Sequence, residues 1–142
     1  MNKEIVNEKF KNAVETSESE FGKYFLSKFF DLDVSYTEDT CTIEFEVEDY
    51  MYNPMGVLHG GVIAFVLDNS MGHLCKKVIG AAVTVEMKIQ YMKATKSGKL
   101  ICTAEFLKKG RNISFLESKM FDVDGNIVAS ATGTFAKVKQ QQ

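Results

Sequence analysis

Asp68 is the residue whose surroundings point most directly to chemistry. It stands in the middle of an almost wholly apolar segment, Leu58 to Cys75, with the sequence LHGGVIAFVLDNSMGHLC. A carboxylate in apolar surroundings needs a polar partner, water or a second protein surface, because its charge is costly to bury alone. Beside a substrate, such a group can act as a general base or as a nucleophile. Asp68 is therefore the first candidate for a catalytic residue.

Gly60 and Gly61 open the same segment. The first amides of a helix have no partner within the helix and lie at the positive end of its dipole, so they can polarise a carbonyl oxygen on which negative charge develops. Glycine also leaves room for a substrate to approach. The alternative is that both glycines only allow tight packing where a helix enters a sheet.

Histidine and serine residues of the segment suggest two further kinds of site. His59 and His73 are 14 residues apart, a rise of about 21 Å along one helix, so they cannot share a metal ion within one subunit. A triad of Ser70 with Asp68 and a histidine is disfavoured, because residues two apart on a helix point in different directions. We expect no metal site and a structural role for His73.

The segment that carries Asp68 is predicted to be a helix. Its length favours a helix over a strand, and a helix that is apolar on nearly every side is normally buried within a fold. Gly80 is expected to end it. Side chains spaced by three or four residues mark one core-facing stripe, with Asp68 outside it: Ile63, Leu67, Met71, Leu74 and Val78.

Five strands are predicted from alternating apolar and polar residues. They are residues 40–48, 83–91, 99–108, 112–121 and 127–138. The last four are expected to form a meander, and the pair Asp124-Gly125 predicts a two-residue hairpin turn before the final strand. One face of the second strand is predicted to carry Val83, Val85, Met87, Ile89 and Tyr91.

The N-terminal part is predicted to be helical to about residue 27. Residues 3–15 place apolar side chains at helical spacing, and a short helix over 18–26 is expected to run into a further strand. The tail 137–142 is expected to be disordered. No repeat or linker divides the chain, so we predict one α+β domain, residues 1–142, with an antiparallel sheet around one long helix.

Composition excludes several classes of function. With 142 residues, 45% hydrophobic and 25% charged, the chain is an ordinary globular protein. A formal net charge of -2 gives no global attraction to nucleic acid or to an anionic membrane. The charged N-terminus is unlike a secretory signal, and no apolar run reaches the length of a membrane span. Cys41, Cys75 and Cys102 are predicted to be reduced core thiols, so we expect a cytoplasmic protein.

The residues around Asp68 resemble those of the hotdog-fold acyl-CoA thioesterases, in particular the branch with the phenylacetate-pathway and mammalian acyl-CoA thioesterases. The similarity extends from about Asp33 to Val138. Its specific parts are Asn53-Pro54-Met55-Gly56-Val57-Leu58-His59-Gly60-Gly61, Asp68-Asn69, Val83-Thr84-Val85-Glu86-Met87 and Tyr91-Met92.

This resemblance implies hydrolysis of an acyl-CoA thioester, without a metal or organic cofactor, in a dimer that can pair again into a tetramer. It implies that Asp68 is the general base or nucleophile, that the Gly60 amide polarises the thioester carbonyl, and that Asn53 and His59 line the same pocket. Thr84 stands where the family often has serine, and its hydroxyl could orient water or Asp68. One base and one oxyanion site suffice, since a thiolate leaves readily.

A small basic cluster is a candidate for binding the phosphates of coenzyme A. It consists of Lys108, Lys109 and Arg111, and a solvated hairpin turn is the alternative. The other expected substrate contacts are Gly61, Met55 and Phe65. These residue types could accept either an aryl or a fatty acyl group.

The spacing of Gly60 and Asp68 predicts that two subunits share each site. Eight residues along one helix rise by about 12 Å, whereas a carbonyl, its attacking water and a base together span about 7 Å. One helix therefore cannot supply both groups to one carbonyl. Two antiparallel helices related by a dimer axis could place each Asp68 opposite the other Gly60.

Two other classes of function stay open. A hotdog dehydratase or hydratase would also act on acyl thioesters, but that branch usually pairs a catalytic histidine with a separate acid, and this helix carries Asp68 without a suitable partner. A non-catalytic acyl-CoA-binding protein could use the same pocket. Such sensors usually append a DNA-binding domain, which we do not expect here.

Overall fold

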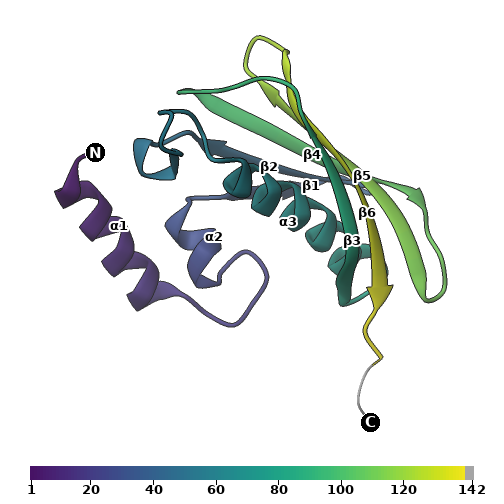
Figure 1. Cartoon of the computed structure of the whole chain (residues 1–142). Helices are drawn as coiled ribbons and strands as arrows, with labels where there is room; N and C mark the ends of the chain where they lie inside the picture. Colours follow the sequence, from purple (N-terminus) through teal and green to yellow (C-terminus); the bar gives the residue numbers. More distant parts are fainter. Residues whose placement is uncertain (140–142) are drawn as a thin grey trace.

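The structure, a computed structural model, describes residues 1–139. Within these residues, six strands form one antiparallel sheet, and the long helix α3 (Gly60–Val78) packs against one face of it (Figure 1). Two further helices, α1 (Lys3–Thr16) and α2 (Phe25–Phe29), lie on the side of α3 that faces away from the central strands (Figure 1). The predicted α+β architecture with a sheet around one helix is confirmed.

The strand order differs from the predicted meander. The strands are β1 (Asp33–Tyr36), β2 (Thr40–Glu46), β3 (Ala82–Tyr91), β4 (Lys99–Lys108), β5 (Ile113–Asp122) and β6 (Ile127–Lys137). They are arranged in the order β1-β2-β4-β5-β6-β3, so only β4 to β6 form a meander and β3 is an edge strand beside β6. The connection after β3 returns the chain to the middle of the sheet, and the carbonyl of Thr95 in it accepts from the Leu58 amide at 2.8 Å.

β3 contains a bulge that reverses part of its predicted face. Thr84 pairs with Phe135 and Glu86 with Thr134, which leaves Val85 as an extra residue without a partner on β6. Thr84 therefore shares the inner face with Met87 and Ile89, whereas the prediction placed Val83 and Val85 there. Both valines are instead exposed, by 55% and 60%. A strand with an extra residue changes the parity of its alternation, which the sequence pattern does not reveal.

α3 is buried along most of the predicted stripe. Ile63, Leu67, Met71 and Leu74 are buried against the sheet, but Val78 lies exposed in the last turn. The helix ends at Ile79, and Gly80 follows with a φ of +99°, a left-handed conformation that favours glycine. The predicted end at Gly80 is confirmed.

The N-terminal prediction is right for the first helix and wrong for the second. α1 starts at an Asn2 cap, whose side chain accepts from the amides of Glu4 and Ile5. Residues 18–24 form a turn closed by the Glu18 amide on the Lys23 carbonyl at 2.9 Å, and α2 starts only at Phe25. Clustered aromatic residues hold this part together, with Phe25 stacked on Phe29.

Three smaller predictions can be compared with the structure. The turn between β5 and β6 has four residues instead of two, because the Asp122 side chain accepts the amides of Asp124 and Asn126. The three cysteines are free and buried, as predicted. In the tail, Lys137 still belongs to β6 and Val138 donates to the Ala81 carbonyl, whereas residues 140–142 lie outside the described residues.

Candidate active site

Asp68 finds its polar partner on the edge strand. The Thr84 hydroxyl donates a hydrogen bond of 2.6 Å to Oδ1 of Asp68. Asp68 itself is half-buried on the flank of α3 that faces β3, outside the core stripe. The β3 bulge is the cause of this contact, because it turns Thr84 inward. The second carboxylate oxygen has no hydrogen bond within residues 1–139, so it can accept a proton from a bound water or attack a carbonyl.

The start of α3 presents one free amide. His59 is the N-cap, and its Nδ1 accepts from the Gly61 amide at 2.8 Å. This bond consumes the Gly61 N–H, whereas the Gly60 N–H makes no hydrogen bond to any other part of the described chain. Because Nδ1 of a neutral His59 is the acceptor, its proton sits on Nε2, which makes the ring a donor toward solvent. Gly60 is thus the amide that is free to polarise an oxygen.

Both glycines have close side-chain neighbours. A Cβ on Gly61 would lie 3.0 Å from Nδ1 of His59, so a side chain there would disturb the cap. A Cβ on Gly60 would lie 3.3 Å from the ring of Tyr91. The Tyr91 hydroxyl also donates to the Gly60 carbonyl at 3.0 Å. The end of β3 therefore fixes the first turn of α3, a role for Tyr91 that the sequence analysis missed.

Asn53 and Met55 belong to the loop before α3. Oδ1 of Asn53 accepts from the amide of Met55 at 2.9 Å, and the Asn53 amide donates to the Val57 carbonyl at 2.9 Å. The side-chain oxygen of Asn53 thus shapes the loop, and its Nδ2 is left for another partner. The Met55 side chain is 80% exposed, and the hydrogen bond of its amide to Asn53 ties it to the loop.

Phe65 lies one helical turn before Asp68 and faces the N-terminal helices. It packs edge-on against Tyr24, with ring centroids 6.5 Å apart, and against Phe30 at 5.6 Å. The Tyr24 hydroxyl is bonded to the Asn69 amide group, with an O–O distance of 2.7 Å to Oδ1. Burial raises the pKa of Tyr24, so this hydroxyl stays protonated at neutral pH. Tyr24 was not predicted, because the mixed pattern of residues 17–30 gave no clear element, and Asn69 was noted beside Asp68 without a role.

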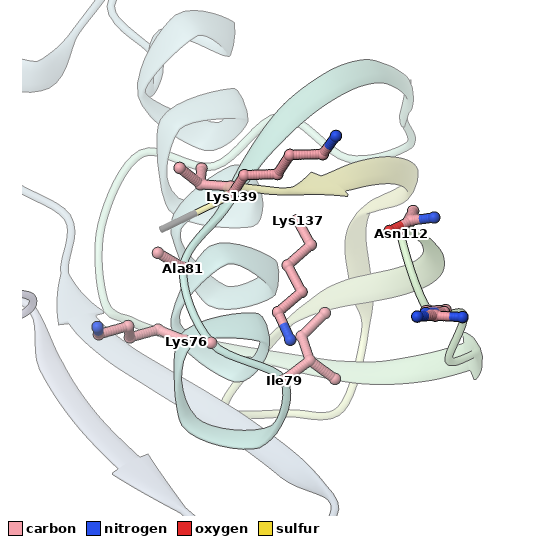
Figure 2. A pocket seen from close by; sticks show the side chains of 9 residues that line it. Lys76, Ile79, Ala81, Asn112, Lys137 and Lys139 are labelled. Carbon is pink, nitrogen blue, oxygen red and sulfur yellow. The ribbon is translucent and has the colours of Figure 1, made fainter. Parts of the chain in front are cut away.

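The predicted basic cluster is divided by the structure. Arg111 lines a cavity of about 540 Å³ at the C-terminal end of α3, whereas Lys109 lies over the ring of Phe106 and lines a separate hollow. Lys108 lines neither cavity. The larger one also holds Lys76, Lys137 and Lys139, with Lys137 extending across it toward Ile79 (Figure 2). No acidic residue lines this cavity. These lysines come from separate elements, so no sequence motif could have indicated them.

His73 and Ser70 are structural, as expected. His73 is only 2% exposed, its Nδ1 lies 2.7 Å from the Tyr36 hydroxyl, and burial lowers its pKa. Ser70 is fully buried and bonded to the Ser118 hydroxyl at 2.7 Å, so it points away from Asp68.

The described residues offer neither a metal centre nor a membrane-spanning helix. Residues 1–139 contain no group of three or more His, Cys, Asp or Glu side chains arranged to hold a metal ion. None of the helices in this part of the chain combines the length and apolar character needed to cross a membrane.

A sheet wrapped around a helix, with an acidic residue on the helix flank and a free amide at its start, defines a hotdog-fold protein. A profile of the thioesterase superfamily matches residues 55–129, which include α3, the bulge and both Asp68 and Thr84. The chain belongs to this superfamily. Human acyl-coenzyme A thioesterase 13 is 34% identical over 95 residues, which cover 64% of this chain and 68% of the human protein. The mouse protein of the same name is 30% identical over 105 residues, 71% and 75% of the two chains.

Solved structures share the fold. A Bacillus halodurans protein determined with CoA superposes with a TM-score of 0.86 at 22% identity, covering 99% of this chain and 97% of the other. A conserved Pseudomonas aeruginosa protein superposes with a TM-score of 0.75 at 30% identity, covering 80% of this chain and 93% of the other. The fold prediction is therefore confirmed, and the first of these similarities includes the N-terminal helices.

Proposed function

We propose that this protein hydrolyses the thioester of an acyl-CoA to a free acid and coenzyme A. The observation that carries the proposal is the Asp68–Thr84 pair, a half-buried carboxylate oriented by a hydroxyl on an open edge of the sheet. Relatives named acyl-coenzyme A thioesterase support this reaction, as does a relative from Salmonella typhimurium named medium/long-chain acyl-CoA thioesterase, 23% identical over 95 residues. No metal or organic cofactor enters the proposed chemistry.

The proposed reaction uses Asp68 and Gly60 in separate roles. Asp68 removes a proton from the attacking water or attacks the carbonyl carbon itself, and Thr84 holds the carboxylate in one orientation. The Gly60 N–H donates to the carbonyl oxygen as it gains negative charge. His59, which directly precedes this amide, and Asn53 in the loop before α3 are proposed to line the thioester pocket. The sulfur leaves as coenzyme A thiolate.

We propose that each site is formed by two subunits. α3 is continuous from Gly60 to Asp68, a rise of about 12 Å, which is too far for both groups to reach one carbonyl. β3 offers a surface for association, because its outer edge is unpaired and Val83 and Val85 are exposed beside it. Pairing two copies along β3 would bury both valines and bring the two α3 helices side by side.

The basic cavity is the proposed site for the phosphates of coenzyme A. Arg111, Lys76, Lys137 and Lys139 surround it without an acidic neighbour, so an anion there would meet only positive side chains. Lys108 and Lys109 are proposed to reach the same nucleotide from the neighbouring turn. The alternative is that Lys76 only complements the negative end of the α3 dipole.

Residues 1–142 are proposed to act as one domain in the cytoplasm. One continuous hydrophobic core and three free, buried cysteines support this assignment. Recovery of the protein from an oxidising compartment in cell fractionation would contradict it.

The reaction itself is tested by release of free thiol. Purified protein is mixed with short-chain, long-chain, aryl and hydroxyaryl acyl-CoAs, and a thiol reagent measures coenzyme A production. We expect turnover with at least one of them. Addition of water to an enoyl-CoA without thiol release would instead favour a dehydratase or hydratase, and binding without turnover would favour an acyl-CoA sensor.

The shared site is tested with two inactive variants. Asp68→Asn removes the base, and Gly60→Pro removes the amide at the first helical position, where proline is tolerated. In a mixed dimer one pocket carries both defects and the other carries neither, so about half of the wild-type activity per dimer should return. Gly60→Ala, which keeps the amide, is the matched control. If confirmed heterodimers remain inactive, the two groups do not act across an interface.

A further inference from the structure

The turn that follows α1 closes a cavity next to the candidate catalytic residue. This cavity of about 350 Å³ is lined by Ser19, Glu20, Phe21, Tyr24 and Asn69. Four of the five residues belong to the N-terminal turn, and the fifth directly follows Asp68 in α3. The N-terminal turn therefore covers a hollow beside the proposed reaction centre, although it lies outside the residues that match the superfamily profile.

Three contacts hold the turn in place. The Tyr24 hydroxyl bonds to the Asn69 side chain at 2.7 Å, and the Tyr24 ring packs on Phe65. On the other side of the cavity, the Phe21 ring packs edge-on against His73, with centroids 5.2 Å apart. The turn is thus fixed to α3 at residues one turn before and one turn after Asn69.

Phe65 connects the cavity to Asp68. On a helix, residues three and four apart are neighbours, so Phe65 touches both the Asp68 and the Asn69 positions on the surface of α3. An acyl group whose carbonyl is held at Asp68 therefore meets Phe65 and Tyr24 when it extends away from the basic cavity. That cavity lies at the other end of the helix, around Lys76.

We propose that the turn 18–24 and α3 together form the pocket for the acyl group, and that Tyr24 is a specificity-determining residue that limits the size of this group. The proposal rests on the proposed function and adds to it the place where the acyl chain binds. Phe21 and Tyr24 give the pocket aromatic walls, and Phe65 packs against the Tyr24 ring beside it, an environment that fits an uncharged hydrocarbon group.

Charge at the mouth of the pocket narrows the substrate class further. Glu20 carries the carboxylate among the lining residues. Its Oε2 lies 3.2 Å from Nζ of Lys23 in a surface ion pair. Two other polar groups of the lining, on Tyr24 and Asn69, are bonded to each other. A dicarboxylic acyl group such as succinyl would bring a second negative charge toward Glu20 without finding a cation inside. The pocket therefore favours monocarboxylic acyl groups.

The test fills and enlarges the pocket in turn. Ser19→Trp places a ring in the cavity, and we expect kcat/KM for dodecanoyl-CoA to fall at least about tenfold relative to that for acetyl-CoA. Tyr24→Ala enlarges the pocket and should shift the ratio of the two kcat/KM values toward the longer substrate.

The effect of the Glu20 charge is tested separately, because Glu20→Gln should raise kcat/KM for succinyl-CoA relative to that for butyryl-CoA. Glu15→Trp, at an exposed position on α1 outside the cavity, is the control and should leave both ratios unchanged.

Binding provides a readout that does not depend on turnover. A non-hydrolysable dodecyl-CoA thioether should bind Ser19→Trp at least about tenfold more weakly than wild type, as measured by calorimetry. If the wild type hydrolyses acyl-CoA but neither Ser19→Trp nor Tyr24→Ala changes chain-length preference or thioether binding, the acyl pocket lies elsewhere. If the wild type hydrolyses no acyl-CoA, the proposed function fails, and thioether binding alone then decides whether the pocket holds an acyl chain.

Discussion

The two edge strands of the sheet, β1 and β3, each send a hydroxyl group to α3, but with different consequences. Tyr36 on β1 meets His73, which is fully enclosed, and Lys77 covers the Tyr36 ring. Thr84 on β3 meets Asp68, which remains half-buried beside an unpaired edge. β1 has only four residues, whereas β3 has ten. His73 is thus buried beside the short edge strand, whereas Asp68 stays half-buried beside the long one.

We expect this difference to separate a structural contact from a catalytic one. At β1, the His73 ring is only 2% exposed and its Nδ1 is occupied by the Tyr36 hydroxyl, so we expect this pair only to stabilise the fold. At β3, the pair leaves one carboxylate oxygen free, next to a surface on which a second copy can pack. Variants of the Asp68–Thr84 pair should therefore change turnover, whereas variants of the Tyr36–His73 pair should change stability.

The largest effect is expected for Asp68→Asn, which removes the base or nucleophile without changing the size of the side chain. Turnover of acyl-CoA should fall at least about a hundredfold, while circular dichroism and the sedimentation coefficient stay as in wild type. Hydrolysis near the wild-type rate would reject Asp68 as the catalytic residue.

Thr84→Val and Tyr36→Phe form a matched pair, since each removes one hydroxyl from an edge strand. We expect Thr84→Val to lower kcat about tenfold, because Asp68 loses the donor that orients it. Tyr36→Phe should leave kcat unchanged and lower the free energy of unfolding by about 1–2 kcal/mol, because a buried hydrogen bond is lost. Denaturant titrations and steady-state kinetics on both variants measure this contrast. Equal effects of the two variants on kcat would remove the distinction between the edges.

His73 makes the β1 contact sensitive to acid. Burial lowers its pKa from the ordinary value of 6.5, so below that pH the unfolded chain binds a proton that the folded chain does not. Stability should therefore be intact above pH 6.5 and fall by up to about 1.4 kcal/mol per pH unit below it, until the pKa of the folded state is reached. His73→Gln, which does not titrate, should show a flatter profile in denaturant titrations between pH 7.5 and 5.5. An identical slope in both proteins would show that other groups cause the acid sensitivity.

The smallest effect is expected for Thr84→Ser. The hydroxyl is retained and only a methyl group is lost from the inner face of β3, so kcat should change by less than about threefold. A loss as large as that of Thr84→Val would mean that the methyl group, and not the hydroxyl, holds Asp68 in place.

Much of the fold could be predicted because local patterns and tertiary structure agree in it. The strict alternation in residues 40–48 indicated the faces of β2, although that strand ends two residues earlier, at Glu46. The predicted range 99–108 matches β4, and the long apolar segment indicated α3. Asp68 was conspicuous for the same reason, as a charge within that segment. Its spacing from Gly60 holds in the continuous helix.

Other parts depend on contacts between distant segments and could not be predicted from the sequence. The bulge at Val85 depends on register with β6, and the place of β3 at the edge depends on which strands pair. Tyr24 lies in a stretch where aromatic residues occur with neither helical nor strand spacing. Its bond to Asn69 joins residues 45 positions apart.

The bulge has a consequence for how activity depends on protein concentration. A regular β3 would turn Val83 and Val85 inward, where each would gain about 1.5–3 kcal/mol from burial, and would turn Thr84 outward. In the bulged strand, both valines recover this burial only if another subunit covers them. The Asp68–Thr84 geometry and association are then thermodynamically linked, so dilution below the dissociation constant would favour the inactive register. Specific activity per 15.9 kDa chain should therefore fall on dilution together with the sedimentation coefficient, even for a substrate that one subunit could bind alone.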